Sequence, residues 1–338
     1  MALTSLADPT PRTVEGHVLV VANPAAAGVS GPMLDEIAAR LGDRGARVTV
    51  AWTTRAGDAV DLAADSAADG EVGLIVAVGG DGTVREVAQG LLDVPQSQSP
   101  VVLALPAGSG NSTARSCWGP RGWQAALDAA LDQRRSCVRA IDLLRLVEPD
   151  VVSVLGASSG FLANVLIGAA DVVGLQGLDR YHAAAAAVLA ALPADPTVVR
   201  VDGVVIHDGP ACLATVGGGR HRAQLYQFLP RSVLDDGQAD VCVIAAVDHA
   251  ARDEIAALVL TGDHLAHPAV RYARGRRVTI ERSDGRPLVA EYDGDLWLRP
   301  GPTMTIDVLA GALALLASIE PPDAEAVSLP DDNGSALS

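Results

Sequence analysis

Basic residues are scarce in this sequence relative to acidic ones. Among its 338 residues, 25 are Lys or Arg and 41 are Asp or Glu, which gives a formal net charge of −16. Broad nucleic-acid binding needs basic surface that displaces counterions from phosphate, so we expect no nucleic-acid partner. Each surface Lys or Arg adds about 1 kcal/mol to docking on an anionic membrane. The charge balance therefore predicts transient membrane contact at most.

Closely spaced cysteines and long apolar runs are also missing. The four cysteines, at positions 117, 137, 212 and 242, form no C-x-x-C spacing, which disfavours a zinc site and predicts a reduced chain. Residues 1–16 contain no apolar segment of the signal-peptide kind. Residues 151–170 lack charge, but glycines, serines and an asparagine interrupt them, so they are predicted as buried strand and loop. These features predict a cytoplasmic protein.

The first 140 residues alternate between strand-like and helix-like segments. The strands are predicted at 17–22, 47–52, 72–78 and 101–105. The helices are predicted from Ser30 and Pro32 to Gly42, at 56–68 and 83–92, after Asn111, and at 123–131. Alternation of this kind is typical of a doubly wound α/β domain with a parallel sheet.

The pattern changes after Ile141, where short β-rich runs follow one another. They lie at 151–155, 197–206, 211–217, 240–247, 276–281, 287–292 and 295–299, with helical segments at 179–192 and 249–261. This predicts an antiparallel β-sandwich domain over 141–302. Residues 303–319, whose end is compatible with a helix, are expected to return to the α/β domain of 17–140. Residues 1–16 and 320–338 are predicted to be flexible tails.

Two glycine-rich turns are the strongest local signals. Gly79-Gly80-Asp81-Gly82-Thr83 and Gly108-Ser109-Gly110-Asn111 each lie between an apolar strand and a helical pattern. Glycines let backbone N–H groups approach a phosphate, and a helix N-terminus adds partial positive charge. The carboxyl ends of parallel strands meet at one edge, so both turns are predicted to converge there. The alternative is that Asp81 simply caps a helix.

Motifs in the same order and spacing characterise a known family. The motifs are the two turns, Asn23-Pro24, Ala140-Ile141-Asp142, Leu234-Asp235-Asp236-Gly237 and Glu291-Tyr292-Asp293-Gly294-Asp295. Through these motifs the chain resembles the catalytic domain shared by diacylglycerol, sphingosine and bacterial lipid kinases. The resemblance covers about residues 17–319. It implies an α/β domain and a β-sandwich domain with ATP in the cleft between them, and a lipid or small-molecule alcohol as phosphoryl acceptor. A homodimer is compatible with it.

The resemblance also implies roles for individual residues. Asp293 would be the base for the acceptor hydroxyl, with Asp81 as the second catalytic residue. Mg²⁺ would be organised through water by Asp81 and Asp142, with Asp295 as a further candidate. The expected nucleotide-binding residues are Asn23, Pro24, Thr53, Arg55, Gly79, Gly80, Asp81, Gly82, Thr83, Gly108, Ser109, Gly110 and Asn111.

Some features leave alternatives open. Bacterial relatives usually carry Asp where this chain has Ser112, which leaves room for a protein that binds nucleotide or lipid without transfer. The acidic charge also suits a kinase of the same fold acting on a small soluble alcohol. NAD kinases share the first turn, but their usual Asn-Glu pair is absent. If the acceptor is a lipid, the residues expected to line its site are Phe161, Leu162, Val165, Leu166, Ile167, Val172, Val173 and Leu175.

Overall fold

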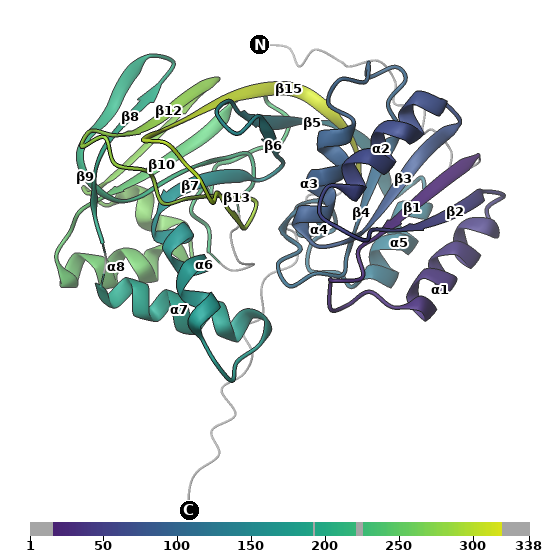
Figure 1. Ribbon diagram of the computed structural model, residues 1–338, viewed down its shortest axis with the longest axis horizontal. Coiled ribbons are helices and arrows are strands. Elements are labelled where there is room, and N and C mark those ends of the chain that lie inside the picture. The colour runs from purple at the N-terminus through teal and green to yellow at the C-terminus, as the bar shows by residue number, and fades with distance from the viewer. Residues whose placement is uncertain (1–15, 192, 221–225, 320–338) are drawn as a thin grey trace, which may run out of the picture.

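The computed structural model describes residues 16–191, 193–220 and 226–319 and shows two domains bridged by long strands (Figure 1). The first domain contains β1 (His17–Ala22), α1 (Gly31–Gly42), β2 (Arg47–Trp52), α2 (Asp58–Asp69), β3 (Val72–Gly79), α3 (Asp81–Gly90), β4 (Val101–Pro106), α4 (Ser112–Trp118) and α5 (Trp123–Leu131). Its strands pair in parallel in the order β4-β3-β1-β2. The predicted doubly wound α/β domain is confirmed.

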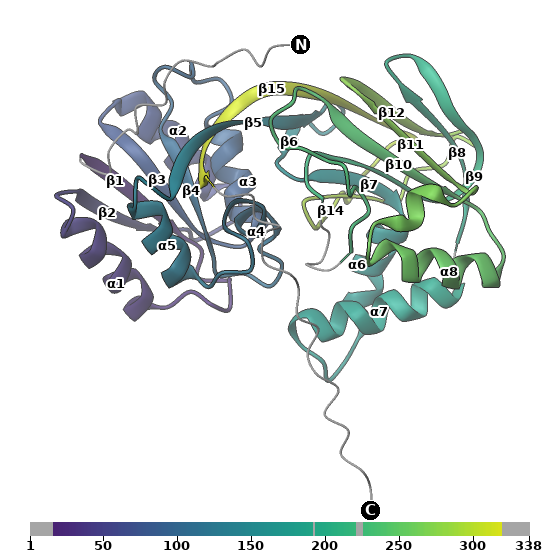
Figure 2. The same ribbon diagram turned by 180° about the vertical axis from the view of Figure 1, so that it is seen from behind.

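Helices cover both faces of this sheet. α1 and α5 lie on one face, where Arg40 of α1 donates to Asp128 of α5 at 2.7 Å, and α2 and α3 lie on the other (Figures 1 and 2). The predicted start of α1 is confirmed, because the Ser30 side chain accepts from the backbone N–H of Met33. β3 is buried almost throughout, as expected for a central parallel strand.

The second domain is an antiparallel β structure with helices along one side (Figures 1 and 2). Its elements are β5 (Ser136–Leu146), β6 (Val151–Ser153), β7 (Gly156–Gly160), α6 (Phe161–Asp171), α7 (Gly177–Ala191), β8 (Asp195–Val201), β9 (Val204–Gly217), β10 (Ala239–Ala245), α8 (His249–Val259), the short 3₁₀ helix η1 (Asp263–Ala266), β11 (Val270–Gly275), β12 (Arg277–Arg282), β13 (Ala290–Tyr292), β14 (Asp295–Leu296) and β15 (Thr303–Ser318). The predicted β-rich second domain is confirmed.

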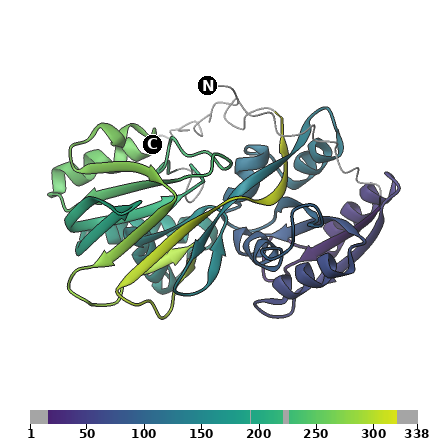
Figure 3. The ribbon, with the colours of Figure 1, turned by 90° about the horizontal axis from the view of Figure 1, so that it is seen from above.

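The segment after Pro302 corrects one expectation. Its end was predicted to be compatible with a helix, but it forms the single strand β15 of 16 residues, which crosses from the second domain to the first (Figures 1 and 3). β15 pairs antiparallel with β12 and β5, and its far end pairs in parallel with β4 through Leu315 and Val102. Pairing along the strand outweighs local helix propensity here. β5 and β15 therefore join the two domains.

Residues 161–171 correct a second expectation. Residues 151–170 were predicted as strand and loop, yet residues 161–170 lie in helix α6, which follows β7 at Gly160, where φ is +94°. Phe161, Val165 and Ala169 lie at helical spacing and pack in one apolar cluster with residues of α7. Within the described residues, no helix is both long enough and apolar enough to cross a lipid bilayer.

A buried histidine lies in the apolar core that α8 and η1 cover. His264 is fully buried, its Nε2 lies 3.2 Å from the carbonyl oxygen of Phe228, and its Nδ1 has no hydrogen-bond partner among the described residues. Burial lowers the pKa of His264 below its ordinary value of 6.5, and the Phe228 carbonyl opposes this shift. The folded protein therefore favours the neutral ring.

We expect His264 to make the fold sensitive to acid. Because the folded-state pKa lies below the unfolded value, its contribution to stability is present above about pH 6.5 and is lost as the pH falls from there through the folded-state pKa. The free energy of unfolding, measured by urea titration, should fall less steeply below pH 6.5 in His264→Leu than in the wild type. Equal slopes for the two proteins would contradict this account.

Candidate active site

Three loops meet at the carboxyl ends of the parallel strands, as the sequence predicts. The backbone N–H of Asn23, after β1, donates to Val78 O at 3.0 Å, and Asn23 Nδ2 donates to Thr83 Oγ1 at 3.2 Å. The N–H of Ala107, after β4, donates to Gly79 O at 3.0 Å. Ala107 O in turn accepts from Gly28 N at 3.0 Å. These bonds tie the loops together at one edge of the sheet.

The two glycine-rich turns touch through their backbones. A Cβ added at Gly108 would lie 2.5 Å from Gly80 Cα and 3.0 Å from Gly80 N, so only glycine fits there without a shift of the chain. A Cβ at Gly80 would meet Gly108 Cα at 3.5 Å, which is ordinary contact. The close approach therefore depends on Gly108, a distinction between the glycines that is not visible in the sequence.

The start of α3 fits a phosphate group. The first amides of a helix have no acceptor within it and point along its axis, where partial positive charge gathers. A Cβ added at Gly82 would meet only the Asp295 carboxylate at 3.5 Å, so the backbone at this turn is open to a ligand. The residues present are therefore suited to an anionic nucleotide tail.

Asp81 bridges the two turns rather than capping its own helix. Its Oδ2 accepts from Ser112 N at 3.0 Å and its Oδ1 from Thr113 N at 2.8 Å, so the carboxylate covers the start of α4. Burial raises the pKa of Asp81, the two backbone donors oppose this, and the nearby charge of Asp293 adds to it. The amides at the start of α4 are thus already occupied and are not offered to a phosphate.

Asn111 closes the second turn upon itself. It has a left-handed backbone with φ of +53°, its Oδ1 accepts from Gly108 N at 2.8 Å, and its Nδ2 donates to Gly108 O at 2.6 Å. Asparagine tolerates this conformation better than most residues with a side chain. In this structure Asn111 shapes the turn that places Gly108 against Gly80.

Thr53 and Arg55 lie after β2 and differ in their surroundings. Thr53 is buried, and its N–H donates to Ala22 O at 2.9 Å beside the first loop. The Arg55 side chain, 67% exposed, folds back on α2 and pairs with Asp58 at 3.0 Å and Asp61 at 2.9 Å. A contact between Arg55 and a nucleotide would require it to leave both carboxylates.

Asp293 faces this edge from the second domain. It occupies a turn at φ of +48° between β13 and β14. Its Oδ1 accepts from Ser153 Oγ at 2.6 Å and from the backbone N–H of Leu155 and Gly156 at 2.9 and 3.1 Å. Oδ2 accepts from Val154 N at 2.7 Å. The carboxylate is thus held rigidly by the loop before β7, with Oδ2 carrying fewer bonds than Oδ1.

Asp295 makes an ion pair between the domains. Its Oδ2 accepts from Arg85 Nη2 of α3 at 2.6 Å, and the Arg85 guanidinium also lies over the Tyr292 ring at 5.1 Å. Arg85 is 13% exposed at this contact and Asp295 is 53% exposed. The pairing favours an interdomain contact for Asp295 over the metal role that the sequence suggested.

We therefore expect Asp295→Asn to leave the Mg²⁺ dependence of activity unchanged. The variant retains an oxygen that can accept from Arg85 Nη2 and loses only the charge of a side chain that is 53% exposed. The half-saturating Mg²⁺ concentration should match that of the wild type at fixed nucleotide. An increase of tenfold or more would instead assign Asp295 to the metal.

Asp142 joins the strands that connect the domains. Its Oδ1 accepts from Gly311 N of β15 at 2.7 Å and its Oδ2 from Gly237 N at 2.6 Å. Gly311, with φ of +61°, lies where the pairing of β5 and β15 shifts register. Burial raises the pKa of Asp142, and the two backbone donors oppose this shift. The Asp142 carboxylate thus stabilises the position at which the pairing of β5 and β15 is irregular.

The described residues contain no group of three or more His, Cys, Asp or Glu side chains arranged to hold a metal ion. Asp81, Asp142 and Asp295 each have protein partners instead. Mg²⁺ sites commonly use one or two carboxylates together with substrate phosphates. These carboxylates suit Mg²⁺ that is bound mainly by nucleotide phosphates. They do not form a metal site from protein ligands alone.

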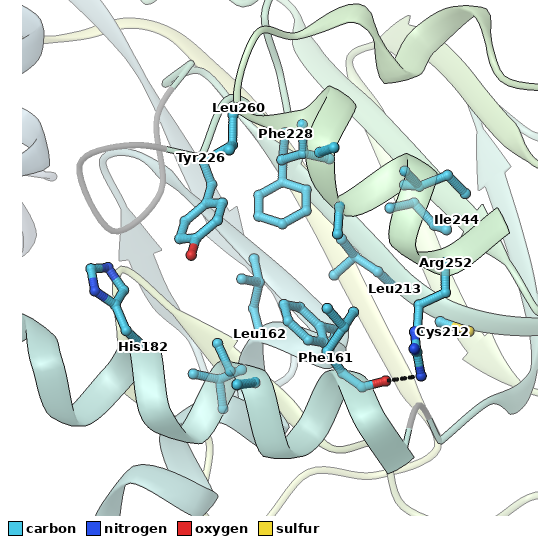
Figure 4. A pocket seen from close by; sticks show the side chains of 18 of the residues that line it. Phe161, Leu162, His182, Cys212, Leu213, Tyr226, Phe228, Ile244, Arg252 and Leu260 are labelled. Carbon is cyan, nitrogen blue, oxygen red and sulfur yellow. Dashed lines mark hydrogen bonds between the residues drawn. The ribbon is translucent and has the colours of Figure 1, made fainter. Parts of the chain in front are cut away.

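An apolar cavity of 430 Å³ lies in the second domain, between α6, α7 and α8 and the strands β9 and β10 (Figure 4). Of the eight residues expected to line a lipid site, Phe161, Leu162 and Val165 line this cavity. Val173, at 93% exposed, instead faces solvent. The sequence did not predict α7 and α8 among the walls of this site. The alanine run of α7 could have indicated a wall here, because small side chains leave space beside a helix.

β7 connects this cavity to the Asp293 loop. The strand begins at Gly156, whose N–H binds Asp293, and ends at Gly160, directly before Phe161 of the cavity wall. At about 3.3 Å per residue, its five residues span roughly 16 Å. The second domain thus carries a carboxylate at one end of a strand and an apolar cavity at the other.

Comparisons with known proteins identify both domains of the chain. Residues 17–146 match the diacylglycerol kinase catalytic domain, and residues 156–317 match the YegS C-terminal NAD kinase beta sandwich-like domain. The chain is 28% identical over 247 residues to a diacylglycerol kinase of Bacillus subtilis, covering 72% of this chain and 79% of that one. It is 28% identical over 270 residues to a "Probable lipid kinase YegS-like" of Xanthomonas oryzae, covering 78% and 84%.

Solved structures show the same fold. A crystal structure of a diacylglycerol kinase from Bacillus anthracis covers 90% of this chain and 97% of its own, with a TM-score of 0.70 and 21% sequence identity. At this identity the likeness concerns the fold alone. It bears out the α/β domain followed by a β-sandwich domain that the sequence predicts.

Proposed function

We propose that this chain, which belongs to the diacylglycerol kinase catalytic domain family, transfers the γ-phosphoryl group of ATP to a hydroxyl group of a lipid. The observation that carries the proposal is the pair of glycine-rich turns at the sheet edge of one domain, which face a domain with both a fixed carboxylate and an apolar cavity of 430 Å³. A cavity of this size and character suits an apolar ligand.

The glycine-rich turns would position the nucleotide. Phosphoryl transfer depends mainly on positioning and on neutralising the charge of the phosphates, so rigid backbone donors are its chief requirement. The start of α3 offers amides for the phosphates, and the contact of Gly80 with Gly108 fixes the geometry of both turns. When bound, Mg²⁺ would neutralise phosphate charge.

Asp293 would accept the proton of the acceptor hydroxyl. Its Oδ2 accepts from Val154 N, whereas Oδ1 accepts from three donors, so Oδ2 keeps capacity for another hydrogen bond. The three donors to Oδ1 keep the carboxylate in place. An anchored carboxylate with one open oxygen satisfies the geometric requirement for a general base.

The net charge of −16 favours one second candidate, a kinase of the same fold acting on a small soluble alcohol. Ser112, where bacterial relatives usually have Asp, suits a third candidate that binds without transfer. Its backbone N–H nevertheless supports Asp81, as the hydrogen bond at 3.0 Å shows.

Transfer of label from γ-labelled ATP into a mixed extract of lipids and soluble metabolites tests these alternatives together. We expect the label in an organic-phase lipid, with at least 10²-fold slower labelling by the Asp293→Asn variant. Label only in water-soluble products would favour the second candidate. Nucleotide binding without any labelled product would favour the third.

A further inference from the structure

The cavity of the second domain has two chemically distinct ends. His182 of α7 and Tyr226 lie at one end, and Arg252 of α8 lies with Cys212 at the other (Figure 4). α7 begins on the side that faces the first domain and ends beside α8 at the outer edge of the second (Figures 1 and 2). The His182 end is therefore the one nearer the phosphoryl-transfer site.

Arg252 closes the outer end. Its Nη1 donates to Leu189 O at 3.2 Å, near the C-terminus of α7, and its Nε donates to Asp253 at 2.8 Å. The Arg252 side chain is 15% exposed, and its charge is balanced by Asp253. This arrangement joins α7 to α8 and offers no free charge to a ligand, so the outer end suits the methyl terminus of a chain.

The volume limits what the cavity can hold. An apolar cavity of about 150 Å³ holds one six-carbon benzene ring, so a space of 430 Å³ admits on the order of seventeen carbons. That is one long alkyl chain. The two long chains of an ordinary diacylglycerol would not both fit.

His182 supplies a buried polar atom to this end of the cavity. Its Nε2 is buried, with no hydrogen-bond partner in the part of the chain that the structure describes. Its ring meets the Tyr226 ring edge-on at 6.4 Å between centroids. A buried polar atom of this kind costs stability unless a ligand or water satisfies it. A hydroxyl group suits it in either tautomer, because a hydroxyl both donates and accepts.

We propose that the acceptor is a single-chain amphiphile. Its alkyl chain lies in the cavity and points from His182 toward Arg252, and His182 Nε2 hydrogen bonds to a hydroxyl group just above the chain. That this amphiphile is phosphorylated rests on the proposed function, whereas its binding in the cavity does not. The inference makes His182 a specificity-determining residue and Arg252 the limit of chain length.

Binding of 1-monoacylglycerols of increasing chain length, measured by calorimetry without nucleotide, tests the cavity. Each added methylene should tighten binding about fourfold until the cavity is full. Ala186 lines the cavity and Ala187 does not, although both are exposed residues of α7. Ala186→Phe should therefore remove the gain for the longest chains, and Ala187→Phe should bind like the wild type. Equal behaviour of the two variants would overturn the placement.

The role of His182 has its own test. His182→Leu should weaken monoacylglycerol binding by about three- to tenfold, the loss expected for one hydrogen bond. His182→Gln, which retains a donor and an acceptor, should restore most of it. Binding of the plain alkane chain should be the same in all three proteins. Equal monoacylglycerol affinity in the Leu and Gln variants would remove His182 from the account.

Phosphorylation of chain-matched acceptors separates this inference from the proposed function. We expect kcat/KM for a monoacylglycerol to exceed that for the diacylglycerol with the same chains by at least tenfold. A diacylglycerol phosphorylated equally well would overturn the single-chain inference and leave the lipid kinase intact. Chain-length-dependent binding without transfer to any acceptor would contradict the kinase function and leave the placement of the alkyl chain intact.

Discussion

Gly108→Ala is expected to lower kcat/KM for phosphoryl transfer by about 10²-fold. The new Cβ would lie 2.5 Å from Gly80 Cα, so one of the two turns must move. Both neighbours are backbone atoms and cannot rotate away. A misplacement of about 1 Å in a positioning element commonly costs 10²-fold in rate. Steady-state kinetics with ATP and a lipid acceptor measure the effect.

Two matched substitutions control for the loss of a glycine. A Cβ at Gly80 would meet Gly108 Cα at 3.5 Å, so Gly80→Ala should retain activity within a few-fold. Gly31→Ala, at the exposed start of α1 with open space around it, should match the wild type. If Gly108→Ala folds normally and is as active as Gly80→Ala, the contact between the turns does not set the nucleotide geometry.

Asp293→Asn is expected to lower turnover by 10²- to 10⁴-fold, the usual contribution of a general base. Asparagine also accepts a left-handed backbone, so the φ of +48° should survive the change. Nucleotide affinity, measured by calorimetry, should stay close to that of the wild type, because the glycine-rich turns belong to the other domain. An Asp293→Asn enzyme with most of its kcat would limit this residue to holding the Ser153–Gly156 loop.

Ser153→Ala separates the chemical role of Asp293 from its structural one. The variant removes the donor at 2.6 Å from Oδ1 but keeps the carboxylate and its three backbone donors. We expect a loss of stability of about 1 kcal/mol and a change in turnover of a few-fold at most. If Ser153→Ala lost as much turnover as Asp293→Asn, the order of the loop would explain both effects.

The α/β half was predictable because local signals and global pairing agree there. The apolar run of β3 and the amphipathic pattern of α3 lie on either side of Gly80, and the structure places all three as predicted. Convergence of the two glycine-rich turns follows from the rule that the carboxyl ends of parallel strands share one edge. Both conclusions need only short-range information.

β15 could not be predicted in the same way. Its apolar residues suit a strand or a helix, and pairing with β5 and β12, which are distant in sequence, decides between them. The partners of Asp81, Asp142 and Asp295 are equally non-local. Asp81 reaches Ser112, 31 residues away, and Asp295 reaches Arg85, 210 residues away. An acidic motif identifies such residues without saying which backbone or side chain they hold.

An apolar site for a lipid was expected from the sequence, but the elements that form its walls were not predicted. Its walls come from α6, α7, α8 and two strands, and only packing brings them together. Phe161, Leu162 and Val165 were expected to line a lipid site because they are apolar. His182 and Arg252, which give the cavity its two ends, carry no apolar signal and were found only in the structure.

Side-by-side phosphoryl transfer from labelled ATP to a long-chain alcohol acceptor and to its short, water-soluble analogue tests the central claim most directly. If the apolar cavity binds the acceptor, kcat/KM must rise steeply with chain length, since each buried methylene contributes about 0.8 kcal/mol. We predict a preference of at least 10²-fold for the long chain, reduced in Ala186→Phe and retained in Ala187→Phe. Equal efficiency with the two acceptors would contradict a lipid kinase and would leave a kinase of soluble alcohols.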